Sequence, residues 1–517
     1  MTLAALLARV PAVDVYATGE SWKALEIDKL VYDSREAGPS TLFFALSGTH
    51  TDGHRYLAEV AACGCRAFVV SQPPDTLPAA CREPGSVLLR VESARLALSP
   101  FAAAFYGQPS HEIPVIGVTG TDGKSTTVSF IHQLLELAGH PSGFFSTVEW
   151  KTGAHIEANK FRQSTPEAPL IHESLRRMVD NGLHYAVLES TSHGLSPLTN
   201  RLGDVRYAAA VFTNVTLEHL EFHGTVEQYR RDKARLFAAL AAGPKKAFGV
   251  INGDDPHAGL FAEAAGDRAV FRYSISDPKA HLFARSLHET AEALDLELVW
   301  KGEAATCHLG IPGRVNAENL MAALLTVAGL LSLRGPRENP LVTPLDLLPL
   351  VPSLRPLKGR MTPVRAGQSF SVVVDYAHTP GAFEKLLPAV KAVTPGRLIV
   401  VFGSGGERDR EKRPLQGALA DRWADLIVLT DEDPRLEDPQ AILSDLEAGI
   451  TGKTLGASYW KIIPRREALR HAFSLAVAGD TVLLLGKGHE QSLVTATGSH
   501  PWDEESVARE LLTGDSR

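Results

Sequence analysis

Residues 117–127 read Gly117-Val118-Thr119-Gly120-Thr121-Asp122-Gly123-Lys124-Ser125-Thr126-Thr127 and lie between an apolar run and a helical pattern. Glycines let the backbone wrap closely around an anion, and the first N–H groups of the following helix point at it. Lys124 offers a positive charge to a phosphate oxygen, and the Ser125 hydroxyl suits Mg²⁺. The stretch predicts a nucleotide-phosphate loop. Because Val118 stands where the strict P-loop pattern has its first glycine, it favours a particular branch of ATP-using enzymes over a generic NTPase.

Bulk composition is typical of a soluble globular protein with several domains. The chain has 517 residues, more than one ordinary core can hold, which predicts about two to four domains. A hydrophobic share of 44% and a charged share of 22% fit this class. The net charge of -8 argues against nucleic acid as the main partner.

Cysteine usage and the N-terminus predict a cytoplasmic protein. The four cysteines are Cys63, Cys65, Cys81 and Cys307. Because no second pair matches Cys63-Gly64-Cys65, reduced thiols are expected in place of a zinc site. The apolar run 3–10 lacks a basic leader and is interrupted at Arg9, which argues against a signal peptide. No apolar run approaches the length of a membrane span, so no membrane insertion is expected.

The region from Val115 onward alternates strand and helix patterns. Apolar residues recur at helical spacing from Val128 to Ala138, and Gly139 ends that helix. Further buried strands are predicted over residues 185–188 and 209–212. This alternation predicts an α/β fold with a parallel sheet and crossover helices.

Four apolar runs in the C-terminal part predict a second α/β domain. They cover residues 371–374, 398–402, 426–429 and 481–485, and each ends in a polar or glycine-rich motif. Open α/β sheets bind ligands at the carboxyl ends of their strands, so these motifs predict a second ligand site. The predicted domains are residues 1–105, 106–353 and 354–517.

Three side chains could complete a nucleotide site. Glu189 ends a buried strand. By itself it would be interpreted as a turn cap or as a partner of a surface base, but beside a phosphate loop it is predicted to bind Mg²⁺. His219 follows the next strand, and a neutral imidazole is a good metal ligand, although most single histidines are structural. Lys233 lies in an amphipathic helical pattern, where a solvated lysine is the ordinary interpretation. Its ammonium has no lone pair and could bind a metal only as a carbamate formed with CO₂.

Charged side chains also follow the C-terminal strands. Arg408 belongs to a basic cluster after Gly405-Gly406, which could be a solvated loop or a site for carboxylates and phosphates. Asp433 lies beside Arg435 in another strand-end loop, and Glu490 is a further possible ligand for an amine. Together they offer sites for an amine and a carboxylate, as an amino-acid substrate requires.

The ordered set of motifs resembles that of the Mur ligase family, ATP-dependent enzymes that form amide bonds. The resemblance covers essentially the whole chain. The matching segments are residues 33–35, 52–56, 120–127, 189–195, 212–224, 229–237, 311–319, 359–361, 375–380, 405–414, 433–435 and 486–490. It implies three domains: an N-terminal UDP-binding domain, a central P-loop-type ATPase domain with a parallel sheet, and a C-terminal Rossmann-like domain.

The resemblance also implies roles for single residues. The ATP-binding set is Gly120, Thr121, Asp122, Gly123, Lys124, Ser125, Thr126, Asn316, Arg360 and Asp375. The set for a UDP-linked substrate is Ser34, Asp52, Gly53, His54, Ser164, Thr165, Ser192 and Arg201, with Arg201 at a longer spacing than usual. The amino-acid set is Arg408, Asp433, Arg435, Gly486 and Glu490. The catalytic set is Lys124, Glu189, His219 and Lys233. The ligands of two Mg²⁺ ions are Ser125, Glu189, His219 and carbamylated Lys233.

The activity that the resemblance implies is addition of a diamino acid to UDP-N-acetylmuramoyl-L-alanyl-D-glutamate through an acyl phosphate, by a monomeric cytoplasmic enzyme that uses ATP. The identity of the diamino acid stays open. Arg435 can hold a carboxylate in a bidentate fork, which favours meso-diaminopimelate. Asp433 stands where diaminopimelate-adding members usually have asparagine, and its charge could favour L-lysine or L-ornithine. The balance leans slightly to meso-diaminopimelate.

Three other functions are the alternatives. A folylpolyglutamate synthetase would lack the UDP-binding domain that Asp33-Ser34-Arg35 indicates. A P-loop GTPase or kinase switch would need no amino acid, and no guanine-reading motif is evident. An inactive binding protein would not need to retain Lys124 and Glu189. Phosphate release that depends on an amino acid would separate these functions.

Overall fold

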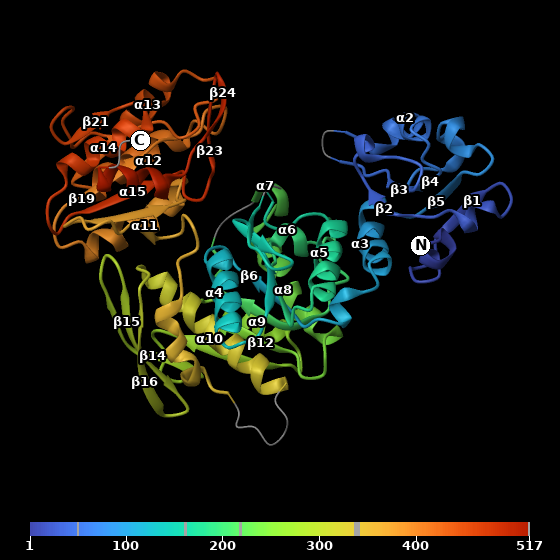
Figure 1. The fold of residues 1–517 in the computed structure, drawn as a ribbon, viewed down its shortest axis with the longest axis horizontal. Coiled ribbons are helices and arrows are strands. Elements are labelled where there is room, and N and C mark those ends of the chain that lie inside the picture. The colour runs from blue at the N-terminus through green and yellow to red at the C-terminus, as the bar shows by residue number, and fades with distance from the viewer. Residues whose placement is uncertain (49–50, 160–162, 217–219, 335–341, 515–517) are drawn as a thin grey trace. The chain divides into compact units, whose positions relative to one another are not determined.

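The chain forms two compact units in a computed structural model, which describes residues 1–48, 51–159, 163–216, 220–334 and 342–514 (Figure 1). One unit comprises Met1–Tyr273 and Leu325–Val342, and the other comprises Ser274–Leu324 and Thr343–Arg517. Both contain sheets and helices, so the predicted α/β class is confirmed.

The N-terminal sheet has five strands in the order β1–β5–β4–β3–β2. Strands β2 to β5 are parallel, and β1 pairs antiparallel with β5. The elements of this part are α1 (Leu3–Leu7), β1 (Asp14–Ala17), β2 (Lys29–Val31), β3 (Thr41–Phe44), α2 (Leu57–Ala62), β4 (Ala67–Val70), β5 (Val87–Arg90) and α3 (Ala94–Phe105). Neighbouring residues of β3 face opposite cores, because Phe44 packs with Phe101 of α3 and Phe43 with the cluster around Leu57 of α2.

The central sheet of the first unit runs β13–β12–β11–β6–β10–β7–β8–β9. Its strands are β6 (Val115–Thr119), β7 (Ser142–Phe145), β8 (Glu149–Lys151), β9 (Glu157–Ala158), β10 (Tyr185–Glu189), β11 (Tyr207–Phe212), β12 (Phe248–Asn252) and β13 (Ala269–Ser274). Its helices are α4 (Lys124–Leu137), α5 (Ala168–Asp180), α6 (Ser192–Leu195), α7 (Leu220–His223), α8 (Val226–Ala238) and α9 (Ala258–Ala264). Strands β7, β10, β6, β11, β12 and β13 are parallel, which confirms the predicted parallel sheet.

Register places three strand ends beside one another in this sheet. Glu189 at the end of β10 pairs with Val118 of β6, and Phe212 at the end of β11 pairs with Thr119. Strands β6, β10 and β11 are buried along their whole length, as expected for parallel strands with both faces covered. The segments that follow these strands therefore meet at one edge of the sheet.

The second unit has an antiparallel meander and a six-stranded sheet. The meander is β14 (Leu282–Glu289), β15 (Leu294–Trp300) and β16 (Glu303–Leu309). The sheet has the order β17–β18–β22–β19–β20–β21, and all its pairs are parallel except that of β17 with β18. Its strands are β17 (Thr362–Pro363), β18 (Ser371–Asp375), β19 (Leu398–Phe402), β20 (Leu426–Leu429), β21 (Tyr459–Lys461) and β22 (Thr481–Leu485). The four predicted C-terminal strands are thus confirmed.

Helices and a hairpin complete this unit. The 3-10 helix η8 (Pro344–Ser353) begins at Thr343 with a reciprocal cap between Thr343 and Asp346. Helix α11 (Pro380–Val393) begins after Thr379, whose side chain accepts from the backbone of Ala382. The remaining elements are α12 (Lys412–Trp423), α13 (Pro439–Glu447), α14 (Arg465–Leu475), β23 (Ser492–Thr495), β24 (Gly498–Pro501) and α15 (Glu504–Thr513).

Helix α10 (Arg314–Arg334) corrects one expectation from the sequence. It has 21 residues, and the stretch Arg314–Ser332, with a mean hydropathy of 1.3, is long and apolar enough to cross a membrane. The expectation that no run approaches that length was therefore wrong. However, 72% of its apolar window is buried, as in an ordinary core helix, and one such helix is weak evidence for a membrane span.

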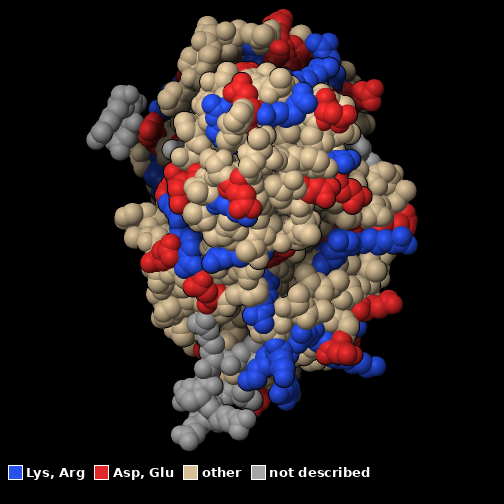
Figure 2. All heavy atoms as spheres, turned by 90° about the vertical axis from the view of Figure 1, so that its right-hand side faces the viewer, with Lys and Arg blue, Asp and Glu red and all other residues tan. Residues whose placement is uncertain are grey.

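Charged side chains are interspersed on the face drawn in Figure 2. Lys and Arg alternate with Asp and Glu over most of this face, and a small basic group lies near its lower edge. Interspersed charges of both signs produce weak local fields, whereas nucleic-acid surfaces usually carry an extended basic stripe.

Candidate active site

The phosphate loop, residues 120–123, joins β6 to α4 and is held by the end of β11. Gly120 has a φ of +155°, and a Cβ there would lie 1.9 Å from Oγ1 of Thr213, so this position needs glycine. Thr213 Oγ1 donates to the carbonyl oxygen of Asp122 at 2.6 Å. Helix α4 begins at Lys124, directly after the loop, so that its first N–H groups point toward it. The loop therefore has a tight backbone turn followed directly by a helix start, and its contact with ATP stays a prediction.

Two lysine ammonium groups contact carbonyl oxygens of this loop. Lys124 Nζ donates to the carbonyl of Thr121 at 2.7 Å, and Lys233 Nζ donates to the carbonyl of Gly120 at 2.6 Å. Lys233 is buried on α8, with Nζ 4.5 Å from the ring centroid of Tyr229. The interpretation of Lys233 as a solvated lysine is therefore wrong. Both ammonium groups lie at the loop predicted to bind phosphate.

Glu189 lies directly opposite the first turn of α4. Ser125 Oγ donates to Glu189 Oε2 at 2.8 Å, and both side chains are buried. The Thr147 hydroxyl donates to Glu189 Oε1 and its N–H to Oε2, each at 2.9 Å. These bonds hold the carboxylate in one orientation beside the phosphate loop, so Glu189 is more than a turn cap.

The donor set of Ser125 and Glu189 fits Mg²⁺. This ion prefers oxygen ligands and keeps waters and substrate phosphate oxygens, so one or two protein side chains suffice. Within the described ranges, no cluster of three or more His, Cys, Asp or Glu side chains could hold a metal. His219, the predicted ligand of a second ion, lies outside the described residues.

Several predicted substrate residues meet at the end of β10. Thr165 Oγ1 donates to the carbonyl of Glu189 at 2.8 Å, and Ser164 Oγ lies 2.6 Å from Thr147 Oγ1. Despite its longer spacing, Arg201 reaches the same place, since it donates to the carbonyl of Thr165 and to Glu167 Oε1, each at 2.9 Å. The structure therefore places Ser164, Thr165 and Arg201 around the strand end that carries Glu189.

A buried serine–histidine–aspartate array was missed by sequence reasoning. Ser192 Oγ lies 3.0 Å from His223 Nε2, and His223 Nδ1 lies 2.8 Å from Asp232 Oδ2. Gln228 donates to the other oxygen of Asp232 at 2.9 Å. All three members of the array are buried. Ser192 and His223 are 31 residues apart, and no local spacing links them. The array fixes the predicted substrate residue Ser192 through α8, the helix that carries Lys233.

Asp232→Ala tests how strongly this array supports the fold. The substitution leaves the buried His223 without the carboxylate partner of Nδ1, so we expect the free energy of unfolding to fall by about 1–3 kcal/mol. Glu227→Ala on the same helix is the matched control. Its side chain is exposed and lies 3.9 Å from Arg230, so a change below about 1 kcal/mol is expected. Urea denaturation of both variants measures the difference. Equal losses would show that the array contributes no more to the free energy of unfolding than a surface ion pair does.

The predicted UDP residues of the N-terminal part shape a turn before α2. Asp52 Oδ1 accepts from the backbone N–H of His54 at 3.0 Å and lies 2.6 Å from its Nδ1. The Nε2 atom of buried His54 accepts from the N–H of Ser71 at 3.1 Å. A Cβ on Gly53 would lie 2.7 Å from the backbone nitrogen of Leu46. These contacts explain the motif structurally, and its contact with UDP, like that of Ser34, stays a prediction.

In the second unit, two predicted ATP residues lie together. Asp375 accepts from the N–H groups of Met361 and Ala377 at 2.9 and 2.8 Å, and desolvation raises the pKa of its carboxyl group. The guanidinium carbon of Arg360 lies 5.1 Å from the ring centroid of Tyr376. The third residue, Asn316, donates to the carbonyl of Pro312 at 2.6 Å at the start of α10.

The predicted amino-acid residues lie at the ends of β20 and β22. Lys487 Nζ contacts Asp433 Oδ1 at 2.8 Å and Glu490 Oε2 at 2.6 Å. Asp433 therefore pairs with a lysine that sequence reasoning did not single out, rather than with its neighbour Arg435. Gly486 has a φ of +98°, and a Cβ there would lie 2.6 Å from Glu432 Oε2. The Nε of Arg435 has no hydrogen-bond partner among the described residues.

The basic cluster after Gly405-Gly406 divides into two parts. Arg413 is fully buried and donates to Glu437, Asp445 and the carbonyl of Gly405, and Arg410 also pairs with Glu437. Arg408 is exposed. Arg413 thus holds the loop, whereas the Arg408 side chain lies at the surface, and its contact with an amino acid stays a prediction.

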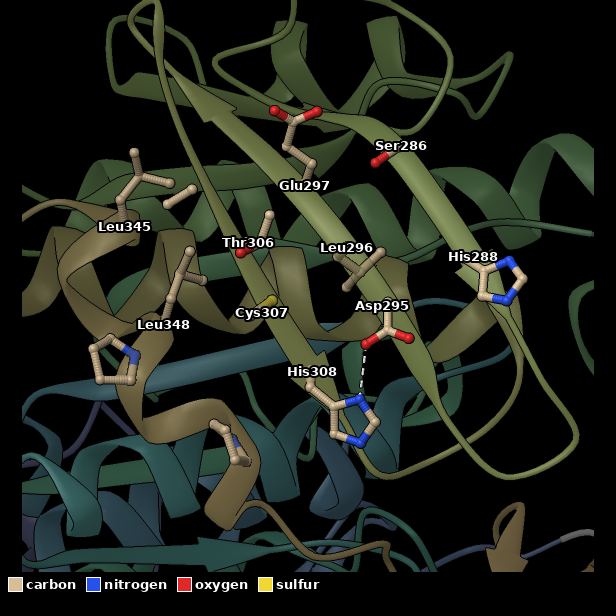
Figure 3. Close-up of a pocket in the computed structure, with 13 residues that line it drawn as sticks. Ser286, His288, Asp295, Leu296, Glu297, Thr306, Cys307, His308, Leu345 and Leu348 are labelled. Carbon is tan, nitrogen blue, oxygen red and sulfur yellow. Dashed lines mark hydrogen bonds and ion pairs between the residues drawn. The ribbon is translucent and has the colours of Figure 1, made fainter.

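A cavity of about 570 Å³ lies elsewhere in the second unit, between the meander and η8 (Figure 3). His308 Nδ1 of β16 lies 2.8 Å from Asp295 Oδ1 of β15, and Leu345 and Leu348 line the apolar side. None of the predicted site residues lines this cavity.

Comparisons with known proteins agree with these motifs. Residues 118–327 match the Mur ligase middle domain, and residues 359–488 match the Mur ligase glutamate ligase domain. The chain is 46% identical to a UDP-N-acetylmuramyl-tripeptide synthetase of Roseiflexus sp. (strain RS-1), over 94% of each chain. It is 34% identical to a UDP-N-acetylmuramoyl-L-alanyl-D-glutamate–2,6-diaminopimelate ligase of Geobacillus kaustophilus, over 98% of this chain and 99% of that protein. A solved structure of a ligase with the latter name superposes with a TM-score of 0.67 at 28% identity, over 97% of each chain.

Proposed function

The chain belongs to the Mur ligase family of ATP-dependent, amide-bond-forming ligases of peptidoglycan precursor synthesis, and we propose that it adds a diamino acid to UDP-N-acetylmuramoyl-L-alanyl-D-glutamate. The observation that carries this proposal is the pairing of Ser125 with Glu189 at 2.8 Å beside the phosphate loop. A loop that binds ATP phosphates and an oxygen pair suited to Mg²⁺ are what activation of a carboxylate by ATP requires.

The proposed reaction has two steps. The D-glutamyl carboxylate attacks the γ-phosphorus of ATP, the bond to ADP breaks, and an acyl phosphate forms. The amine of the amino acid then attacks the acyl carbon and displaces phosphate. Lys124 neutralises charge on the transferred group, because its ammonium lies at the loop before the reaction begins. Bound Mg²⁺ supplies further charge neutralisation, with Ser125 and Glu189 as ligands of one ion and His219 and Lys233 as ligands of a second.

For Lys233 the proposal includes conversion to a carbamate. CO₂ adds to the neutral amine with loss of a proton, which turns a cation into an oxygen ligand for Mg²⁺. The carbamate nitrogen keeps one N–H, so its hydrogen bond to the carbonyl of Gly120 can persist. Burial of the side chain protects this group from bulk water.

The remaining assignments complete the proposal. Residues 1–105, with Ser34, Asp52, Gly53 and His54, bind the UDP end of the substrate. Residues 106–353 carry out the chemistry, with Ser164, Thr165, Ser192 and Arg201 at the muramoyl peptide. Residues 354–517 bind the amino acid. The enzyme is a cytoplasmic monomer that acts on small molecules, without nucleic acid or membrane insertion.

The charges around Asp433 favour meso-diaminopimelate as the added residue. Asp433 Oδ1 already accepts from Lys487 and from the N–H of Val494, each at 2.8 Å, so its charge is compensated. Arg435, whose Nε has no hydrogen-bond partner among the described residues, can hold a carboxylate. L-lysine and L-ornithine lack the second carboxylate that such a site would bind.

An assay of phosphate release with UDP-N-acetylmuramoyl-L-alanyl-D-glutamate tests this function. We expect release to depend on the amino acid, with a higher kcat/KM for meso-diaminopimelate than for L-lysine or L-ornithine. Omission of the amino acid is the control and is expected to abolish sustained release. Release without any amino acid would indicate an NTPase, and ligation of glutamate to a folate would indicate a folylpolyglutamate synthetase. Preference for lysine or ornithine would contradict only the choice of diamino acid.

A further inference from the structure

We propose that Lys487 is a specificity-determining residue that biases the pocket toward a diamino acid with a second carboxylate. This inference rests on the proposed function, because it concerns the amino-acid substrate of that ligase. It gives a role to a side chain that the predicted amino-acid set does not include.

Lys487 is a buried cation between the two acidic residues predicted to bind the amine. Its side chain is 0% exposed, whereas those of Asp433 and Glu490 are 16% and 34% exposed. The ammonium lies 2.8 Å from Asp433 Oδ1 and 2.6 Å from Glu490 Oε2. A buried ammonium requires such partners, so the three groups form one ion-pair cluster. Asp433 and Glu490 are therefore already paired with Lys487 before an amino acid enters the pocket.

The backbone fixes Lys487 in this place. It lies between Gly486, with a φ of +98°, and Gly488, with a φ of +44°. A Cβ on Gly488 would lie 2.6 Å from Cβ of Tyr376, so the loop passes too close to the end of β18 for any larger residue. Because the loop is confined in this way, the ammonium cannot easily withdraw from the cluster when an amino acid binds.

Hydrogen bonds from β23 also hold the segment that carries Asp433. Val494 of β23 donates its N–H to Asp433 Oδ1 at 2.8 Å and accepts from the N–H of Arg435 at 3.0 Å. These bonds keep Asp433 turned toward Lys487 and place Arg435 in a backbone conformation with a φ of +56°. The Nε of Arg435 has no hydrogen-bond partner in the described part of the chain, which leaves its fork available for a ligand.

The balance of charges then decides between substrates. Lys487 and Arg435 are the cations of this pocket, and Asp433, Glu490 and the buried Glu432 are its carboxylates. L-lysine and L-ornithine carry a net positive charge at neutral pH, whereas meso-diaminopimelate carries none. Each cation in the pocket disfavours the monocarboxylic diamino acids and favours a second carboxylate. Removal of Lys487 would lower the charge of the pocket by one unit, and removal of Asp433 would raise it by one unit.

The test compares kcat/KM for meso-diaminopimelate, L-lysine and L-ornithine in wild type, Lys487→Met, Asp433→Asn and the double variant. We expect the ratio of diaminopimelate to lysine to fall by about tenfold or more in Lys487→Met, as one unit charge a few ångströms away can produce. It should rise in Asp433→Asn and return toward the wild-type value in the double variant. Lys461→Met is the matched control, because Lys461 pairs with Glu447 at 2.6 Å on β21 and lies outside the predicted site.

A purely structural role for Lys487 would lower all three activities by the same factor and leave their ratio unchanged, which would overturn the inference. If Lys487→Met alone fails to fold in thermal unfolding, the ratio in the double variant is compared with that in Asp433→Asn, and an unchanged ratio would equally overturn the inference. A wild-type enzyme that ligates none of the three amino acids would instead contradict the proposed function. The two failures are therefore distinguishable.

Discussion

Replacing Lys124 by alanine is expected to lower kcat for ligation by about 10²–10³-fold, the effect of removing one group that stabilises transition-state charge. Lys124 is the first residue of α4, and its Nζ already lies 2.7 Å from a carbonyl of the phosphate loop. Alanine is the strongest helix former, so the start of α4 should survive. The loss should appear in kcat more than in KM for ATP, because negative charge is most concentrated during phosphoryl transfer.

Steady-state phosphate release with saturating ATP measures this effect. Lys246→Ala is the matched control, since Lys246 is an exposed lysine of the same unit and is expected to change kcat by less than about twofold. Circular dichroism should show the same fold for both variants. Full ligation activity in Lys124→Ala would remove the basis for assigning the nucleotide site to this loop.

The second large effect is expected for Arg465→Met, which should destabilise the second unit by about 3–5 kcal/mol. Arg465 and Glu504 are both 0% exposed, and Arg465 Nε donates to Glu504 Oε2 at 2.8 Å. The guanidinium also donates to the carbonyls of Asp431 and Leu485 at 2.9 and 2.8 Å, at the ends of β20 and β22. The substitution leaves a buried carboxylate without its cation and releases both strand ends that frame the predicted amino-acid pocket.

Thermal unfolding and denaturant titration measure this loss. Arg466→Met is the matched control, because Arg466 is the next residue and forms a partly exposed pair with Glu510 at 3.0 Å. This substitution should lower the free energy of unfolding by less than about 1 kcal/mol. The double variant Arg465→Met/Glu504→Leu should recover much of the stability, since it removes both charges together. A single variant as stable as the control would show that this ion pair does not support the fold.

The sequence predicted the fold well where the signal is local. The strands before the phosphate loop and at residues 185–188 and 209–212 were expected from buried apolar runs, and β6, β10 and β11 contain them. Glu189 and the loop met because both follow strands of one parallel sheet, and parallel strands end at the same edge. A rule of topology was enough to bring these residues together.

Local patterns failed where a side chain's partner lies far along the chain. Lys233 reads as a surface lysine on an amphipathic helix, yet it is buried against the phosphate loop. His223 and Asp232 carry no spacing that reveals their contact with Ser192. Arg408 and Arg413 belong to one basic cluster in the sequence, but Arg408 is exposed whereas Arg413 is buried and holds the loop.

The sequence by itself determined the α/β class, the phosphate loop and the order of the motifs, because glycine conformations, a helix start and apolar periodicity depend on neighbouring residues. Only the tertiary structure decided the charge state of the predicted amino-acid pocket. Lys487 reaches Asp433 across 54 residues of chain, and the two meet only because β20 and β22 end at the same edge of one sheet. Electrostatic compensation depends on distance in space, which the spacing of two motifs along the chain does not specify.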